Sequence, residues 1–137
     1  MVDANHAYSR REALSLARAI EEHDIGWFEE PLSGGITETK KILDMAQAFG
    51  VEYAPHCWGS AVGLAAAVHL LANWDTVPGR MREPEPLLEL DRTRNVFREE
   101  LAHPRLADQG GRVRVPDGPG LGIDVDEDLV QRYSVKS

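Results

Sequence analysis

Residues 26–32 read Gly-Trp-Phe-Glu-Glu-Pro-Leu, a short apolar run that ends in two carboxylates and a proline, and the rest of the chain is organised around it. A strand that buries aromatic side chains and then presents acid at its tip is typical of a parallel sheet whose carboxyl edge enters a polar site. Pro31 cannot donate to a ladder, so we expect the strand to stop and Glu29 to lie at the rim. Neighbouring carboxylates are costly to hold together without a cation, and oxygen ligands favour Mg²⁺ or Mn²⁺. The alternative is a solvated acidic turn after an ordinary strand.

The residues before this strand predict a helix and an earlier strand. Asp3 and Asn5 are polar residues of the kind found at a strand end, with hardly any strand before them. Ser9 fits an N-cap with Glu12 three residues on, and apolar residues then recur at helical spacing. A strand, helix and strand of this length form a right-handed parallel crossover in nearly all folds. We therefore expect Asp3 and Glu29 to emerge on the same face of one sheet.

The residues after the acidic run predict two more helices with a strand between them. A glycine-containing loop at 33–37 leads into a helix that Gly50 ends. Residues 51–56 are predicted to form a third strand, with His56 at its end. A very apolar helix follows over 61–73, as expected of a helix packed on a sheet and against neighbours. The buried side of the helix before Gly50 is predicted to consist of Ile42, Leu43, Met45, Ala46 and Phe49.

The last part of the chain is predicted to be less regular. Residues 74–86 shift to proline, glycine and charge, which marks a loop or crossing segment. Residues 87–90 form a short strand-like run that carries Glu89 toward the interior or the rim. A charged turn and helix over 91–100, a half-exposed strand over 112–115, a rigid turn over 116–122 and a short helix over 124–133 follow.

Composition narrows the class of protein. The chain has 137 residues, enough for one domain with a real core but well short of the roughly 250 residues of a closed (β/α)₈ barrel. With 23 acidic and 15 basic residues the formal charge is -8, so nucleic acid is not an expected partner. The longest apolar run is too short to span a bilayer, so no membrane partner is expected. No secretory signal opens the chain, and its one cysteine, Cys57, fits a reducing compartment, so a cytoplasmic location is expected.

Five segments carry a family pattern when they are taken together and in order. They are residues 2–5 (VDAN), 27–31 (WFEEP), 34–37 (GGIT), 55–59 (PHCWG) and 116–122 (PDGPGLG). The chain resembles, on these segments, the mandelate racemase branch of the enolase superfamily, and most closely its acid-sugar dehydratases and lactone cycloisomerases. This resemblance implies the fold class α/β, as an incomplete (β/α)₈ TIM-barrel fragment of the enolase C-terminal type with helices covering parallel strands.

The resemblance also implies a chemistry and roles for particular residues. The family removes a proton next to a carboxylate, and Mg²⁺ stabilises the enediolate that results. Asp3 and Glu29 match the positions that bind the metal, and His56 matches a general acid or base. Glu89 matches a catalytic glutamate that helps to stabilise the enediolate.

Several residues have a second, purely structural interpretation. The resemblance puts Asn5 and Trp58 at the substrate rim, whereas residue type alone favours core packing for Trp58 and for Trp27. Cys57 beside the histidine could be a thiol nucleophile, but a lone cysteine is usually a small buried hydrophobe. The remaining histidines are predicted to be surface or packing residues; they are His6, His23, His69 and His103.

The chain departs from the family pattern at one junction. After Leu32 it runs directly into the loop that normally follows the sixth strand, so two βα units, on the order of sixty residues at roughly thirty per unit, are absent. With them go a third acidic metal ligand and the aspartate that orients the catalytic histidine. Glu38 and Asp44 on the following helix are poor substitutes. The expected domains are 1–100, a partial (β/α) barrel with this gap after residue 32, and 101–137, a C-terminal segment that in the family packs toward a capping domain.

Two functional hypotheses follow. The first is a Mg²⁺-dependent enzyme that dehydrates, racemises or cycloisomerises an acid sugar, with a small-molecule sugar acid or its lactone as partner. The second is a catalytically inactive, truncated remnant, because two carboxylates hold Mg²⁺ only weakly and four strands cannot close a barrel. Open sheet edges favour pairing with another copy, so a homo-oligomer is expected. An unrelated α/β binding module would leave the ordered set of motifs unexplained.

Overall fold

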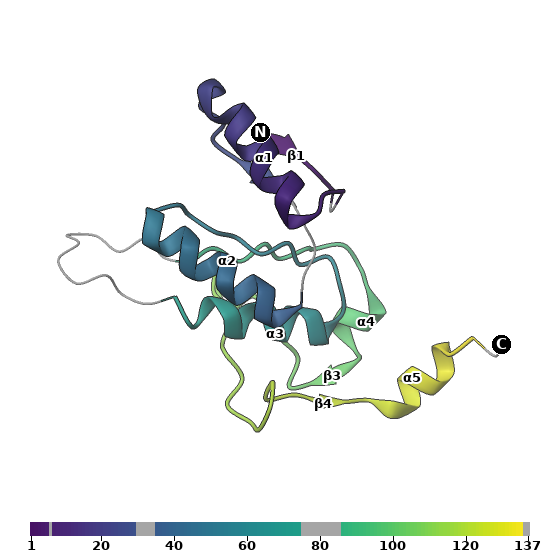
Figure 1. Ribbon diagram of the computed structural model, residues 1–137. Helices are drawn as coiled ribbons and strands as arrows, with labels where there is room; N and C mark the ends of the chain where they lie inside the picture. The colour runs from purple at the N-terminus through teal and green to yellow at the C-terminus, as the bar shows by residue number, and fades with distance from the viewer. Residues whose placement is uncertain (6, 30–34, 75–85, 136–137) are drawn as a thin grey trace. The chain divides into compact units, whose positions relative to one another are not determined.

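The computed structural model describes residues 1–5, 7–29, 35–74 and 86–135, which form a mixed α/β structure (Figure 1). The chain divides into two compact units, Met1–Glu38 and Thr39–Ser137. Strands are few and short in the described part of the chain, and they form two separate two-stranded sheets instead of a closed barrel. The predicted strand stop at Pro31 and the junction after Leu32 lie outside the described residues. The expected domain division at residue 100 stays a prediction.

The first unit is the predicted crossover of strand, helix and strand. Strand β1 (Val2–Asp3) pairs in parallel with β2 (Phe28–Glu29), and helix α1 (Arg10–Ile20) with the short 3₁₀ helix η1 (Glu21–His23) connects them. Ser9 and Glu12 form a capping box at the start of α1, in which the Ser9 backbone N–H donates to Glu12 Oε2 at 2.8 Å. The parallel pair and the helix cap that the sequence predicts are therefore confirmed.

The second unit is built on helices. They are α2 (Ile36–Phe49), whose first turn contains the boundary between the units, α3 (Ala61–Leu71), α4 (Val96–Glu99) and α5 (Glu127–Tyr133). Strands β3 (Ala102–His103) and β4 (Asp124–Val125) form an antiparallel pair. The chain turns sharply before β4, where Gly122 has φ 66° and an added Cβ would lie 2.7 Å from Pro116 Cβ. The rigid turn predicted over 116–122 therefore needs glycine there.

Helix α3 is the centre of the core of the second unit. Two clusters of buried residues contain side chains of this helix: one gathers Leu64, Ala65, Ala67 and Val68 with Cys57 and Leu106, and the other joins Ala61 to Leu101, Ala102 and Leu129. Side chains from the segments 87–90, 112–115 and 121–123 pack against the first cluster. The apolar helix that the sequence predicts is thus present, and most of its faces are covered within this chain.

Three predicted strands are absent from the described residues. The segments 51–56, 87–90 and 112–115 have no strand assignment, so the prediction of further parallel strands is wrong for this structure. Side chains at 112–115 do alternate between exposed and half-buried, as the pattern predicts. A strand also requires ladder hydrogen bonds to a neighbour, and apolar alternation alone cannot supply that neighbour.

Two predictions of burial are also wrong. On α2, Leu43 is fully buried, but Met45 and Phe49 are 60% and 79% exposed although the helical spacing assigned both to the buried side. Trp58 is 65% exposed and Trp27 is exposed as well, so neither indole is a core residue. Helical spacing identifies a common face but not whether a neighbouring element covers all of it.

Among the described residues, none of the helices combines the length and the apolar character that a membrane crossing needs.

Candidate functional site

Asp3 and Glu29 are register partners at the carboxyl ends of the two parallel strands. Backbone hydrogen bonds flank the pair, from the Val2 N–H to the Trp27 carbonyl at 2.9 Å and from the Ala4 N–H to the Glu29 carbonyl at 3.0 Å. Directly paired residues of parallel strands project to the same face, about 5 Å apart at the backbone. The two carboxylates therefore leave the sheet side by side.

Asn5 follows Asp3 in a tight local turn. Its backbone N–H donates to Asp3 Oδ1 at 2.9 Å, and its φ of 45° lies in the left-handed region that asparagine tolerates better than most residues. This bond restricts the orientation of the Asp3 carboxylate. Asn5 itself is exposed, and its predicted contact with substrate stays a prediction.

A second polar group, in the other unit, consists of His56, Trp58 and Glu89. His56 Nδ1 lies 2.9 Å from Glu89 Oε2, and the Trp58 indole N–H donates to Glu89 Oε1 at 3.1 Å. The rings of His56 and Trp58 are stacked, with centroids 5.6 Å apart and an angle of 30° between planes. Each of the three side chains thus contacts the other two.

The core of the second unit explains why these side chains meet. Burial alternates along residues 55–58: Pro55 and Cys57 are buried, whereas His56 and Trp58 face outward. Cys57 belongs to the cluster around α3, and Leu88 and Leu90, which flank Glu89, pack against the same cluster. Both segments are therefore anchored through alternate apolar residues on one core, which leaves the three polar side chains beside one another.

Cys57 is a buried free thiol of the core. Burial raises the pKa of the Cys57 thiol to about 11, and the nearby Glu89 carboxylate adds to the rise. Burial also raises the pKa of Tyr53, with a smaller contribution from Cys57. A thiol that stays protonated at neutral pH is a poor nucleophile, so the geometry favours the structural interpretation of this cysteine.

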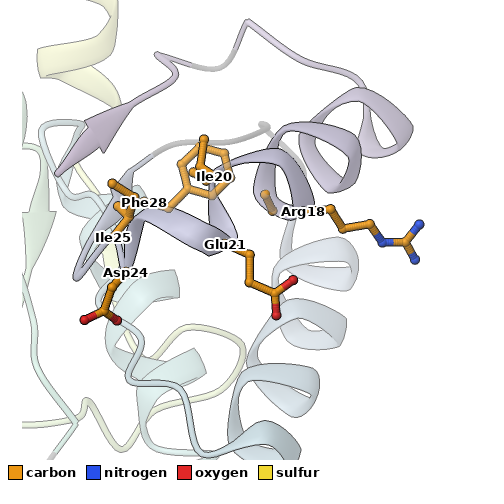
Figure 2. A pocket seen from close by; sticks show the side chains of 7 residues that line it. Arg18, Ile20, Glu21, Asp24, Ile25 and Phe28 are labelled. Carbon is orange, nitrogen blue, oxygen red and sulfur yellow. The ribbon is translucent and has the colours of Figure 1, made fainter.

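Two hollows of the described residues are lined by none of these polar side chains. One, of about 460 Å³, lies in the first unit between α1, η1 and the start of β2. Figure 2 shows Ile20 and Phe28 close together there, while the charged side chains of Arg18, Glu21 and Asp24 extend away from the ribbon. It opens before the amino end of β2, and in parallel α/β folds that end contributes to stability whereas chemistry lies at the carboxyl end.

The second hollow, of about 290 Å³, is lined by charged residues that are paired among themselves. Arg98, only 6% exposed, donates to the Asp91 carboxylate and to the Thr93 carbonyl, and Arg92 pairs with Asp108. Hydrogen bonds from Thr93 and the Arg98 guanidinium hold the pKa of Asp91 below its usual value. This network is structural, and no motif in the sequence indicates it.

The predicted site residues therefore fall into two groups. The structure brings Asp3 and Glu29 together in one unit, and His56, Trp58 and Glu89 together in the other. Their convergence on one mouth stays a prediction. Sequence reasoning missed the contact between Glu89 and the segment of His56, because nothing local marks residues so far apart as neighbours. Among the other histidines, His69 Nε2 lies 3.0 Å from the Leu121 carbonyl, in agreement with a packing role, and His6 lies outside the described residues.

Comparison with known proteins gives a consistent result. A sequence model of the family described as enolase C-terminal domain-like matches residues 1–34 and 32–129. D-galactarolactone cycloisomerase of Agrobacterium fabrum is 30% identical over 182 residues, which cover 97% of this chain and 48% of the relative. D-galactonate dehydratase of Ralstonia pickettii is 34% identical over 116 residues, which cover 82% of this chain and 30% of the relative.

Solved structures of similar fold agree. The 3,6-anhydro-D-galactonate cycloisomerase from Zobellia galactanivorans is 34% identical, with a TM-score of 0.63 over 99% of this chain and 50% of that chain. An enolase from Pantoea ananatis with bound D-gluconate and Mg is 22% identical, with a TM-score of 0.58 over 98% of this chain and 42% of that chain, and this likeness shows the fold alone.

The chain spans about half the length, or less, of the relatives it matches. The alignment with D-galactarolactone cycloisomerase is also longer than this chain, at 182 against 137 residues. The two segments of the family match meet at residues 32–34. The chain therefore lacks an internal segment at the junction where the sequence predicts one to be missing.

Proposed function

Because the chain belongs to the enolase C-terminal domain-like family, in the mandelate racemase and muconate lactonizing branch of the enolase superfamily, we propose that its polar groups serve Mg²⁺-assisted removal of the proton next to the carboxylate of a sugar acid. One observation carries the proposal: Asp3 and Glu29 are paired in register at the carboxyl ends of two parallel strands. The carboxyl end of such strands is where ligands bind in α/β folds.

The acid pair fits a hard divalent cation. Carboxylate oxygens are the ligands that Mg²⁺ prefers, and two carboxylates side by side repel each other unless a cation lies between them. Asp3 and Glu29 would hold the ion, and the bond from the Asn5 N–H to Asp3 Oδ1 would limit the motion of one ligand. When bound, the ion would offset the negative charge that develops on the substrate carboxylate.

His56 is the residue proposed to move the proton. Imidazole is suited to accept and return a proton near neutral pH, and its efficiency depends on a fixed orientation. The contact with Glu89 and the stacking on Trp58 both restrict the ring. Trp58, with most of its side chain exposed, is available as a wall for a sugar substrate.

The substrate proposal rests on the relatives. Two of them are named for galactarolactone and galactonate. A small sugar acid or its lactone is therefore the partner proposed for this chain. A cytoplasmic location is proposed as well, on the single buried Cys57.

A second candidate function is that of a truncated remnant without turnover. It is favoured by the internal segment that the chain lacks and by the two separate two-stranded sheets in its described part. Mg²⁺ keeps its waters unless the ligand cage is well set, and two carboxylates alone set it poorly. In this case the acid pair would bind the ion weakly and no reaction would follow.

We expect isothermal titration of the chain with Mg²⁺ to give a weak binding heat that disappears in Asp3→Asn and Glu29→Gln, because each variant removes one charged ligand. Asp24→Asn is the matched control: it removes one acidic charge from the same unit, and asparagine also tolerates the left-handed backbone of this position. Absence of heat from the unaltered chain would remove the metal site.

Exchange of the proton next to the carboxylate separates the two candidate functions. Galactonate and gluconate are incubated with the chain and Mg²⁺ in deuterium oxide, and deuterium incorporation is followed by NMR. Incorporation that depends on His56 and Asp3 supports the enzyme. Mg²⁺ binding without any incorporation supports the remnant.

A further inference from the structure

Glu89 differs from an ordinary surface carboxylate in how its two oxygens are used. Oε2 lies 2.9 Å from His56 Nδ1, and Oε1 accepts the Trp58 indole N–H at 3.1 Å. The side chains of His56 and Glu89 are 32% and 40% exposed, so each keeps part of its surface in contact with the protein. A carboxylate held at both oxygens has a defined orientation, and this orientation presents one oxygen to the imidazole.

Stacking completes the arrangement. The His56 ring lies against the Trp58 ring at 5.6 Å between centroids, so the imidazole cannot turn without losing contact with the indole. Both aromatic residues flank Cys57, which is fixed in the core, and Glu89 lies between Leu88 and Leu90, which pack on the same core. The supporting contacts thus come from buried apolar residues instead of from flexible surface groups.

A carboxylate at Nδ1 decides where the imidazole carries its proton. An ionised carboxylate only accepts hydrogen bonds, so the neutral imidazole must place its N–H on Nδ1 to satisfy it. Nε2 is then the nitrogen with the lone pair. The hydrogen bond at one ring nitrogen therefore sets the chemistry of the other.

We propose that Glu89 is a positioning residue, which holds the neutral His56 imidazole in the form protonated on Nδ1, and that Trp58 in turn fixes Glu89. Glu89 thereby supplies, from residues 87–90, the orienting carboxylate for the histidine. The relevance to catalysis rests on the proposed function, whereas the fixed proton position is a property of this cluster that needs neither metal nor substrate.

The experiment observes the NMR signals of the two ring nitrogens of His56 in the 137-residue chain. Long-range ¹H–¹⁵N spectra of ¹⁵N-histidine-labelled protein distinguish the two neutral forms, and His56→Gln assigns the signal. The spectra are taken without Mg²⁺ or substrate, about two pH units above the ordinary imidazole pKa of roughly 6.5. We expect the unaltered chain to show His56 protonated on Nδ1.

Variants test whether Glu89 sets the position of the proton on the His56 ring. Glu89→Ala is expected to lose the Nδ1–H form, whereas Glu52→Gln, which removes an exposed acid on the same segment as His56, leaves it unchanged. Glu89→Gln keeps the size of the side chain and replaces Glu89→Ala in the comparison if that variant does not fold. It should lose part of the Nδ1–H form, because a neutral amide is a weaker acceptor than a carboxylate. Trp58→Phe keeps an aromatic ring but removes the N–H donor, so it should also give a partial loss.

Two results would overturn the proposal. An unaltered chain in which His56 has the same proton distribution as in Glu89→Ala would show that Glu89 does not set it. A Trp58→Phe variant identical to the unaltered chain would remove Trp58 from the arrangement. Because no reaction is measured, either result can be told apart from a failure of Mg²⁺ binding or of proton exchange.

Discussion

At the scale of single residues, Cys57 is the buried residue between two side chains that face outward. Its thiol is buried beside α3, while His56 before it and Trp58 after it lie in contact with Glu89. Desolvation disfavours a thiolate in this position, and the Glu89 carboxylate disfavours it further. The same burial that places the histidine therefore makes the neighbouring thiol unreactive.

We expect the Cys57 thiol of the folded chain to react with a disulfide reagent at about pH 8 roughly 100-fold more slowly than in the urea-unfolded chain. The reason is that its pKa is raised from 9.0 to about 11, so the thiolate fraction falls accordingly. The rate should rise with pH up to the raised pKa. The stability that the protonated thiol contributes is present below pH 9 and is lost as the pH rises through about 11.

Glu89→Gln serves as the comparison for this measurement. Burial is the larger cause of the shift, so the variant should accelerate the reaction far less than unfolding does. Equal rates in folded and unfolded protein would contradict the burial of the thiol. The reaction is followed by absorbance of the released reagent.

At the scale of elements, the cap of α1 holds the crossover between the two parallel strands. The Ser9 backbone N–H donates to Glu12 Oε2, and the hydroxyl and backbone N–H of Ser9 together lower the pKa of Glu12 below 4.5. A lowered pKa means that the ionised carboxylate is favoured by folding. Its contribution is present above pH 4.5 and is lost as the pH falls through the lower, folded value.

We expect Ser9→Ala to reduce the free energy of unfolding by about 1 kcal/mol, because the first backbone N–H groups of α1 lose their acceptor. Glu12→Gln should leave the free energy of unfolding nearly unchanged at pH 7, since glutamine also completes a capping box. Between pH 5 and pH 3, about one unit on either side of the ordinary carboxyl pKa, the variant should lose less stability than the unaltered chain. Urea unfolding at both pH values measures these effects. Glu22→Gln, an exposed change beyond α1, is the control; an equally flattened pH profile there would contradict the specific role of Glu12.

At the scale of the whole molecule, α2 exposes large apolar side chains. Met45 and Phe49 are exposed, and Val51 just after the helix is 57% exposed. Large exposed apolar side chains that lie close together mark an interaction surface. The relatives carry an internal segment that this chain lacks, so a second copy of the chain is the partner that we expect to cover this surface.

We expect size-exclusion chromatography with light scattering to find that the unaltered chain is a dimer or a larger species. The double variant Met45→Gln and Phe49→Ser should shift the distribution toward monomer, because it removes the apolar area that drives association. Leu14→Gln is the control, because Leu14 is an exposed apolar residue on α1 in the other unit. A monomeric parent chain, or an equal shift in the control, would contradict a role for this surface.

The sequence by itself determined the features that depend on neighbours along the chain. Serine followed by glutamate at N-cap spacing predicted the start of α1. A strand, a helix and a strand of crossover length predicted that Asp3 and Glu29 emerge on the same face of one parallel sheet, whereas their direct pairing is a finding of the structure. The ordered motifs determined the family and the position of the missing segment, because they are a property of residue order alone.

Only the tertiary structure decided which surfaces are covered and which distant side chains meet. Phe49 and Trp58 are exposed although their residue types favour burial, because burial depends on a neighbouring element that the local pattern does not specify. The contact of Glu89 with His56 likewise depends on two separate segments packing their apolar residues on α3. The physical reason is that periodicity fixes the direction of a side chain, whereas the partner it meets is fixed by the packing of the whole core.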